Sequence, residues 1–174
     1  MRFLQALVLL FLASCSDVRK TSLVPSAKSE NPQLEKLLER KVQSSRKAEI
    51  IQGKSTAIIA IATYLNDVDN VQAARELFLI ELYEKTPSPD IKNKLKSQLI
   101  SGGKSTDSLF ITKLTPSQYT EILYPSNPYN TLFIIEFLRI SAKHRETMRL
   151  KLDIENLGSM DFNFGYPTLN SKLQ

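Results

Sequence analysis

The strongest constraint on the fold is a strict two-residue alternation near the end of the chain. Between residues 148 and 155, apolar side chains occupy every second position and charged side chains occupy the positions between them. The alternation returns at residues 160–164, after the turn-forming residues 156–159. Because successive side chains of a strand point to opposite faces, the pattern predicts a β-hairpin with one face on a core and the other in water.

Other apolar segments predict further strands. They lie at residues 48–52, 55–65, 77–83, 109–114 and 132–140. Residues 55–65 and 132–140 are apolar on both faces, which is typical of strands buried inside a protein. Residues 77–83 are ambiguous, because the residues before them favour a helix by propensity while the apolar run favours a strand, and we expect a strand. A turn at Gly53-Lys54 predicts pairing of residues 48–52 with 55–65.

The sequence also predicts a few helices. Asn31 is a good N-cap and Pro32 suits the first helical position, so a helix is expected at residues 32–44. Its apolar stripe is expected to pack on the domain or, alternatively, to be offered to a partner. A second helix is expected at residues 90–100, ended by Gly102-Gly103, and a short helical turn from Thr115 to Leu123.

These elements together predict a mainly β protein. We expect an antiparallel β-sandwich, immunoglobulin-like or transthyretin-like, with an N-terminal helix and one or two short helices. An α+β fold is the alternative. Residues 31–174 have the length of one such domain.

The first residues have the pattern of an export signal. Arg2 is basic, residues 3–13 are apolar apart from Gln5, and small residues follow. The sequence Leu12-Ala13-Ser14-Cys15 resembles the lipobox of bacterial lipoproteins. The resemblance implies a signal peptide at residues 1–14 and a lipid on Cys15. The residues that follow are polar and include one proline, so they predict a flexible tether at residues 15–30. A plain secretory signal and a buried N-terminal helix are the alternatives.

Cys15 is the sole cysteine of the chain. A lone free thiol in an exported protein is open to oxidation, and acylation would remove it. By the sorting pattern of two-membrane bacteria, Ser16 after the cysteine implies the periplasmic face of the outer membrane. The outer face of the cytoplasmic membrane is the alternative location.

The central part of the chain carries a second, shorter resemblance. Residues 62–66, followed by residues 78–80 in the next apolar segment, look similar to a pair of segments in uncharacterised small envelope lipoproteins. The resemblance implies a type of domain and no activity.

Motifs for catalysis, cofactors or metals are incomplete. GKST occurs at residues 53–56 and 103–106, but the first glycine of a phosphate-binding loop is absent from both copies. His144 is the only histidine and is expected in an exposed hairpin loop. The carboxylate pairs Asp67/Asp69 and Asp153/Glu155 are expected to be ordinary surface. We therefore predict no enzyme activity, cofactor or metal.

Two groups of residues are candidates for partner contact. Tyr124 and Tyr129 lie in a loop stiffened by two prolines, and tyrosines suit protein contacts. Arg139, Lys143 and Arg145 belong to a basic cluster that suits an anionic or acidic partner. Packing on the domain itself and protection of an edge strand are the alternative roles.

The sequence as a whole predicts an envelope lipoprotein with a non-enzymatic role in binding, scaffolding or assembly, such as an accessory of a secretion or surface apparatus. Its expected partners are a membrane, through the lipid on Cys15, and an envelope protein. Removal of residues 1–14 leaves 22 basic and 18 acidic residues, a small charge that does not favour nucleic acid. An anchored hydrolase of peptidoglycan or lipid, or a small-ligand carrier, is the alternative.

Overall fold

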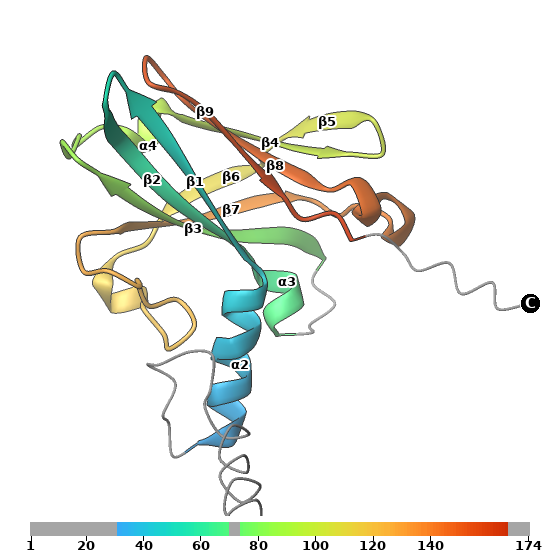
Figure 1. Ribbon diagram of the computed structural model, residues 1–174. Coiled ribbons are helices and arrows are strands. Elements are labelled where there is room, and N and C mark those ends of the chain that lie inside the picture. Colours follow the sequence, from blue (N-terminus) through green and yellow to red (C-terminus); the bar gives the residue numbers. More distant parts are fainter. Residues whose placement is uncertain (1–30, 70–73, 167–174) are drawn as a thin grey trace, which may run out of the picture.

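The structure is a β-sandwich of two antiparallel sheets (Figure 1). It is a computed structural model, and it describes residues 31–69 and 74–166. Cys15, the predicted signal peptide and the predicted tether lie outside the described residues. The architecture confirms the prediction of a mainly β sandwich with an N-terminal helix.

Sheet A has five strands and sheet B has four. The order in sheet A is β1 (Ser45–Gln52), β2 (Ser55–Tyr64), β3 (Arg75–Glu84), β7 (Thr131–Leu138) and β6 (Phe110–Lys113). The order in sheet B is β5 (Lys104–Asp107), β4 (Leu95–Ser101), β8 (Arg149–Ile154) and β9 (Gly158–Asn163). All pairs of neighbouring strands are antiparallel.

The strand order is that of a seven-stranded immunoglobulin-type sandwich with two extra strands. In that fold, strands A, B, E and D of one sheet face C, F and G of the other. Here β2-β3-β7-β6 faces β4-β8-β9, with β5 beside β4 and β1 added beside β2. A group of aromatic rings fills one end of the core, where the ring of Phe78 lies 5.1 Å from Tyr64, 5.8 Å from Phe137 and 5.3 Å from Phe164.

The two-residue alternation produces the predicted hairpin. β8 and β9 pair so that Leu150 faces Phe162 and Leu152 faces Met160, and all four side chains are buried in the core. The predicted hairpin of β1 and β2 also forms. Its turn places Gly53 at φ 62°, a backbone conformation that favours glycine.

The helix predicted at residues 90–100 is wrong. Only Ile91–Lys94 forms a helix, α4, and the chain continues as strand β4. The spacing of Ile91, Leu95 and Leu99 fits one helix face, but Leu95 and Leu99 are also two strand positions that share a face. Ser97 and Ser101 complete that inner face, and their polarity hides the alternation in the sequence.

Two predicted connections also differ. Gly102-Gly103 does not end a helix but turns β4 into β5, and both glycines have positive φ. The segment around His144 is not a hairpin loop, because β7 belongs to sheet A and β8 to sheet B. It forms the 3₁₀ helix η4 (Ala142–Thr147), which crosses between the sheets.

The N-terminal helix α2 (Pro32–Gln43) projects from the sheet A side of the sandwich (Figure 1). As predicted, Asn31 caps it, and its side-chain oxygen accepts from the N–H of Gln33 at 3.0 Å. None of its 12 residues, all of them described, is fully buried. A short helix α3 (Leu65–Val68) lies against it, and η3 (Pro116–Gln118) follows β6. Within residues 31–69 and 74–166, no helix has the length and apolar character to cross a membrane.

The inner face of β4 yields a prediction with a matched pair of variants. Ser97 is 3% exposed, and its hydroxyl has no hydrogen-bond partner in the described part of the chain. Ser101 is 6% exposed, but its hydroxyl donates to the carbonyl oxygen of His144 at 2.8 Å. We expect Ser97→Ala to raise the free energy of unfolding by about 1 kcal/mol and Ser101→Ala to lower it by about 1 kcal/mol. Urea denaturation measures both changes, and equal effects of the two variants would contradict the assignment.

Candidate functional site

The outer face of sheet A, turned away from sheet B, is covered only in part. The chain between β6 and β7 crosses this face and forms a small second core around Leu79, Leu114 and Leu132. The covering stops over β1 and β2, where Ile59 and Ile61 are half-buried. Apolar strand surface therefore remains accessible beside α2.

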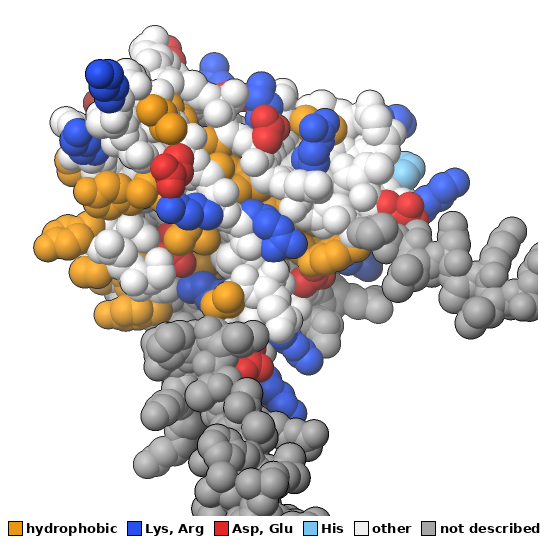
Figure 2. Space-filling model, viewed as in Figure 1, with side chains coloured by type: hydrophobic (Ala, Val, Ile, Leu, Met, Phe, Trp, Pro, Cys, Tyr) orange, Lys and Arg blue, Asp and Glu red, His pale blue; other side chains and the backbone are white. Residues whose placement is uncertain are grey.

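A groove of about 460 Å³ occupies this place. Leu38 and Val42 of α2 form one wall, Ile61 of β2 lies at the floor, and Tyr124 and Pro125 form the other wall. Val42 is 54% exposed and Tyr124 is 63% exposed, so both walls present apolar surface to solvent. Figure 2 shows hydrophobic side chains gathered on this side of the molecule.

Glu81 of β3 holds the two walls of the groove. One carboxylate oxygen accepts from the backbone N–H and the hydroxyl of Ser126, both at 2.7 Å, and from the side-chain amide of Asn130 at 3.2 Å. The other oxygen lies 3.4 Å from the ammonium of Lys41 on α2, which also donates to the carbonyl oxygen of Tyr124 at 2.9 Å. Because Glu81 is 2% exposed, these hydrogen bonds and the ion pair offset the cost of burying its carboxylate.

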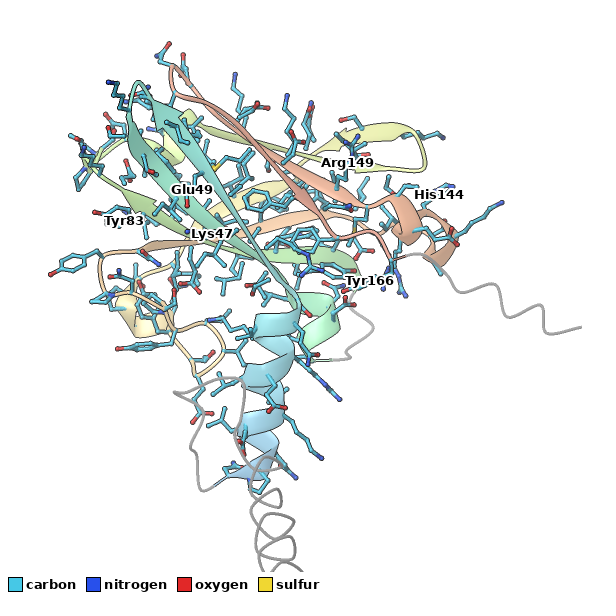
Figure 3. All side chains as sticks on the ribbon, viewed as in Figure 1. Lys47, Glu49, Tyr83, His144, Arg149 and Tyr166 are labelled. Atoms are coloured by element: carbon cyan, nitrogen blue, oxygen red, sulfur yellow. The ribbon has the colours of Figure 1, made fainter. Side chains whose placement is uncertain are left out.

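A second hollow of about 370 Å³ continues along the same face. Ile59 and Ile61 line it together with Tyr83 and Tyr129. Tyr129 is 80% exposed. Lys47 and Glu49 of β1, labelled in Figure 3, form an ion pair of 2.7 Å, and the hydrogen bond from Lys47 lowers the pKa of Glu49. The two hollows share Ile61, Glu81 and Ser126 and make one trough, which is lined by aliphatic residues of β2 and α2 and by tyrosines.

A second buried carboxylate lies at the end of the sandwich core. Glu76 accepts hydrogen bonds from the Tyr64 hydroxyl, from the N–H of Ile140 at 3.0 Å and from Arg145 at 3.2 Å. The Arg145 guanidinium also lies 5.6 Å from the centre of the Tyr64 ring. Burial and the bond to Glu76 raise the pKa of Tyr64. This cluster ties η4 to sheet A and has a structural role.

The predicted contact residues fall into two separate places. Tyr124 and Tyr129 line the trough, whereas the partly exposed Arg145 is bound to the buried Glu76. Arg139 is exposed just before η4, and Lys143 is exposed within it. The η4 segment lies on the other side of the sandwich from the residue 119–130 loop (Figure 1). The structure therefore does not join the tyrosines and the basic residues into one surface.

The other candidate motifs lie in turns and tight contacts. His144 is exposed, and its ring lies so close to Gly102 that a Cβ there would meet it at 2.7 Å. Both GKST segments begin at hairpin turns rather than at helices. Asp67 lies in α3 and accepts from the Tyr166 hydroxyl at 2.7 Å. Among the residues that the structure describes, no group of three or more His, Cys, Asp or Glu is placed to hold a metal ion.

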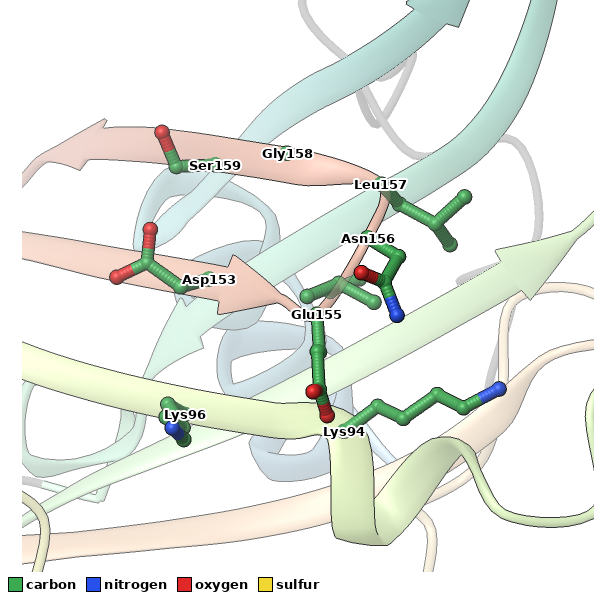
Figure 4. Close-up of a pocket in the computed structure, with 9 residues that line it drawn as sticks. Lys94, Lys96, Asp153, Glu155, Asn156, Leu157, Gly158 and Ser159 are labelled. Carbon is green, nitrogen blue, oxygen red and sulfur yellow. The ribbon is translucent and has the colours of Figure 1, made fainter.

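Another hollow, of about 530 Å³, lies at the turn between β8 and β9 (Figure 4). Lys94 and Lys96 line it together with Asp153 and Glu155. Because Lys96 is opposite Asp153 in the pairing of β4 with β8, the side chains of both signs alternate across a solvated sheet face. This charge pattern is that of an ordinary soluble surface, and the trough is the better candidate site.

The sequence analysis missed Glu81 and Lys41, although one signal was available. Glu81 interrupts the apolar run of residues 77–83. An acid predicted on a buried strand needs a partner, so it marks a place where other elements converge. The identity of those elements depends on contacts between residues far apart in the chain.

The contacts of Glu81 predict that loss of its charge lowers the stability of the fold. Glu81→Gln keeps the shape but removes the charge that Lys41 and Ser126 face, so we expect the free energy of unfolding to fall by about 2–3 kcal/mol. Hydrogen exchange at the Ser126 amide should also become faster. Glu121→Gln, on the exposed rim of the same groove, is the matched control and should change neither quantity. Equal behaviour of the two variants in urea denaturation would show that Glu81 does not hold the groove.

Tyr166 predicts a pH effect whose sign is fixed. Burial, with the hydrogen bond to Asp67, raises its pKa from 10.0 to about 12. The folded state thus favours the neutral phenol, so its contribution to stability is complete below pH 10 and is lost as the pH rises through about 12. In a titration of tyrosine absorbance at 295 nm, Tyr166→Phe should remove one late-titrating phenol, and Asp67→Asn should move it to lower pH. A titration that neither variant alters would contradict the contact.

Comparison of the chain with protein-family models, with curated proteins and with solved structures finds no match.

Proposed function

We propose that this protein is a lipid-anchored envelope lipoprotein that binds a segment of another envelope protein in the trough beside α2. The observation that carries the proposal is the set of contacts that Glu81 makes with Lys41 and Ser126. These contacts fix α2 and the residue 119–130 loop to β3 and keep the groove between them open. A groove that is formed before binding lowers the entropic cost of association.

The chemistry of the trough fits a protein ligand. Its floor carries Ile59 and Ile61 beside Tyr83, and Tyr124 and Tyr129 come from the residue 119–130 loop. Tyrosines offer a large contact area with few rotatable bonds and a polar tip, and they are enriched among residues that dominate binding energy. An apolar segment of a partner that lies in the trough would bury the exposed surface of Val42 and Tyr124.

The anchor belongs to the same proposal. The lipobox-like sequence ends at Cys15, and α2 begins at Pro32. Acyl chains on Cys15 would hold the protein at a membrane, because each buried methylene contributes about 0.8 kcal/mol. We place the protein on the periplasmic face of the outer membrane, with the outer face of the cytoplasmic membrane as the alternative. The trough would then lie beside the helix that leads toward the lipid.

Site-specific photo-crosslinking in intact cells tests the proposal. A benzophenone amino acid replaces Val42 or Tyr124 on the two groove walls, or Ser105 on the distant strand β5 as the control. We expect the two groove positions to capture the same envelope protein, identified by mass spectrometry, and the Ser105 position not to capture it. Val42→Asp in the Tyr124 probe protein should reduce the capture while circular dichroism stays unchanged.

The anchor has its own readout in the same cells. Cys15→Ala should release the protein from the membrane fraction and abolish labelling with a fatty-acid analogue. Retention in the membrane without lipid labelling would disprove the anchor. Adducts that are equal at Val42, Tyr124 and Ser105 would disprove the groove as the binding site.

A further inference from the structure

One edge of the sandwich is left open and apolar. Among the four edge strands described, β1 and β9 lie against each other, and the Arg46 side chain donates to the carbonyl oxygen of Asn163 at 3.1 Å. β5 carries only polar side chains. β6 differs, because Phe110 is 54% exposed, and Leu109 and Leu138 near it are 39% and 59% exposed. Exposed apolar residues at an unpaired edge favour pairing with another strand.

The direction of the backbone groups on β6 follows from its pairing with β7. The N–H of Leu114 donates to the carbonyl oxygen of Leu132 at 2.9 Å, so this pair is hydrogen-bonded. Hydrogen-bonded pairs alternate along an antiparallel ladder, so Thr112 also directs its N–H and C=O to β7. Ile111 and Lys113 therefore direct their N–H and C=O groups to the open edge.

We propose that the chain pairs with a second copy of itself through β6, in antiparallel fashion about a two-fold axis. Ile111 of each copy would form a hydrogen-bonded pair with Lys113 of the other. Thr112 would face Thr112 of the second copy across the axis. The two sheets A would become one continuous sheet of ten strands.

This register is self-complementary in side chains as well as in backbone groups. It sets Lys113 opposite Ile111 of the second copy, so the two lysines do not face each other. Threonine pairs across antiparallel strands are favourable. Phe110 would lie opposite Leu114 of the second copy on the outer face, which shields an exposed ring from water. Arg75 and Glu136, which lie beside the contact, form an ion pair of 2.6 Å and so offset each other's charge.

The direction of α2 fits such a pair. A two-fold axis that relates antiparallel strands of one sheet is perpendicular to that sheet. Because Leu38, Lys41 and Val42 at the end of α2 line the groove on the outer face of sheet A, both copies would carry this groove and the end of α2 on the same side of the joined sheet. Two chains that are anchored in one membrane, as the proposed function requires, need this arrangement. The trough lies over β2 and β3, which β7 separates from β6 in the sheet order, and it remains open.

The anchor also explains how a short contact could suffice. β6 has only four residues, so its pairing buries less area than a typical stable interface. Confinement of both copies to one membrane raises their effective concentration, which converts a weak contact into a populated one. The pairing therefore rests on the proposed anchoring for its strength, although not for its geometry.

Disulfide crosslinking of the full-length protein in membranes tests the pairing. Two residues that face each other in a non-hydrogen-bonded pair have Cα atoms about 4.5 Å apart, a distance that a disulfide spans. After mild oxidation, we expect Thr112→Cys to give at least about tenfold more covalent dimer than Thr106→Cys on β5. Phe110→Asp in the Thr112→Cys protein should reduce the yield to the level of the control, because two carboxylates would then flank the contact.

The outcomes separate the pairing from the anchor. A Thr112→Cys yield no higher than that of Thr106→Cys, or a yield that a folded Phe110→Asp protein leaves unchanged, would overturn the pairing. The parent chain, whose sole cysteine is Cys15, reports on the anchor, since disulfide dimers of the parent would reveal an unmodified thiol. In that case the same crosslinks, repeated at high protein concentration in the Cys15→Ser background, still decide whether β6 pairs.

Discussion

β3 places two glutamates where water does not reach, and the elements outside the sandwich core are arranged by the need to partner their charges. Glu76 points into the core and Glu81 points to the opposite face, since one position is even and the other odd along the strand. A buried carboxylate without donors would cost several kcal/mol. Glu76 binds Arg145 and so holds η4 against sheet A. Glu81 binds Lys41 of α2 and Ser126 of the residue 119–130 loop. One strand thus fixes both the crossover between the sheets and the walls of the groove.

This arrangement couples the N-terminal helix to the rigid part of the molecule. α2 has no fully buried residue among its described positions, so an amphipathic stripe alone would hold it loosely. Lys41 gives it a fixed direction, because its ammonium reaches Glu81 and the carbonyl oxygen of Tyr124 together. At the other side of the helix, Arg40 donates to the carbonyl oxygen of Val68 at 3.4 Å. Lys41 and Arg40 therefore tie the helix to β3 and to the end of α3.

Local pattern predicted most of the fold and little of the site. The period-two runs of β8 and β9 and the apolar runs of β2, β3 and β7 are recorded in neighbouring residues, so they could be read before any tertiary contact was known. β4 could not, because Leu95 and Leu99 satisfy a helix face and a strand face alike, and only burial of Ser97 decides between them. Tyr124 and Tyr129 were predicted as contacts from their residue type. The groove itself depends on residues 41, 81 and 126, whose meeting no local pattern encodes.

The added strand β1 determines which parts of sheet A form the trough and which form its free edge. Without it, β2 would be the edge of sheet A, and Ile61 would lie at the rim rather than on the floor of a trough. The pairing of β1 with β2 also fixes the end of α2. The N–H of Tyr64, at the end of β2, donates to the carbonyl oxygen of Ser44 at 3.0 Å, directly after the helix. By lying against β9, it closes one side of the sandwich to further pairing. The same strand therefore sets α2 at one end of the strand order of sheet A and leaves β6, at the other end, as the second edge of that sheet.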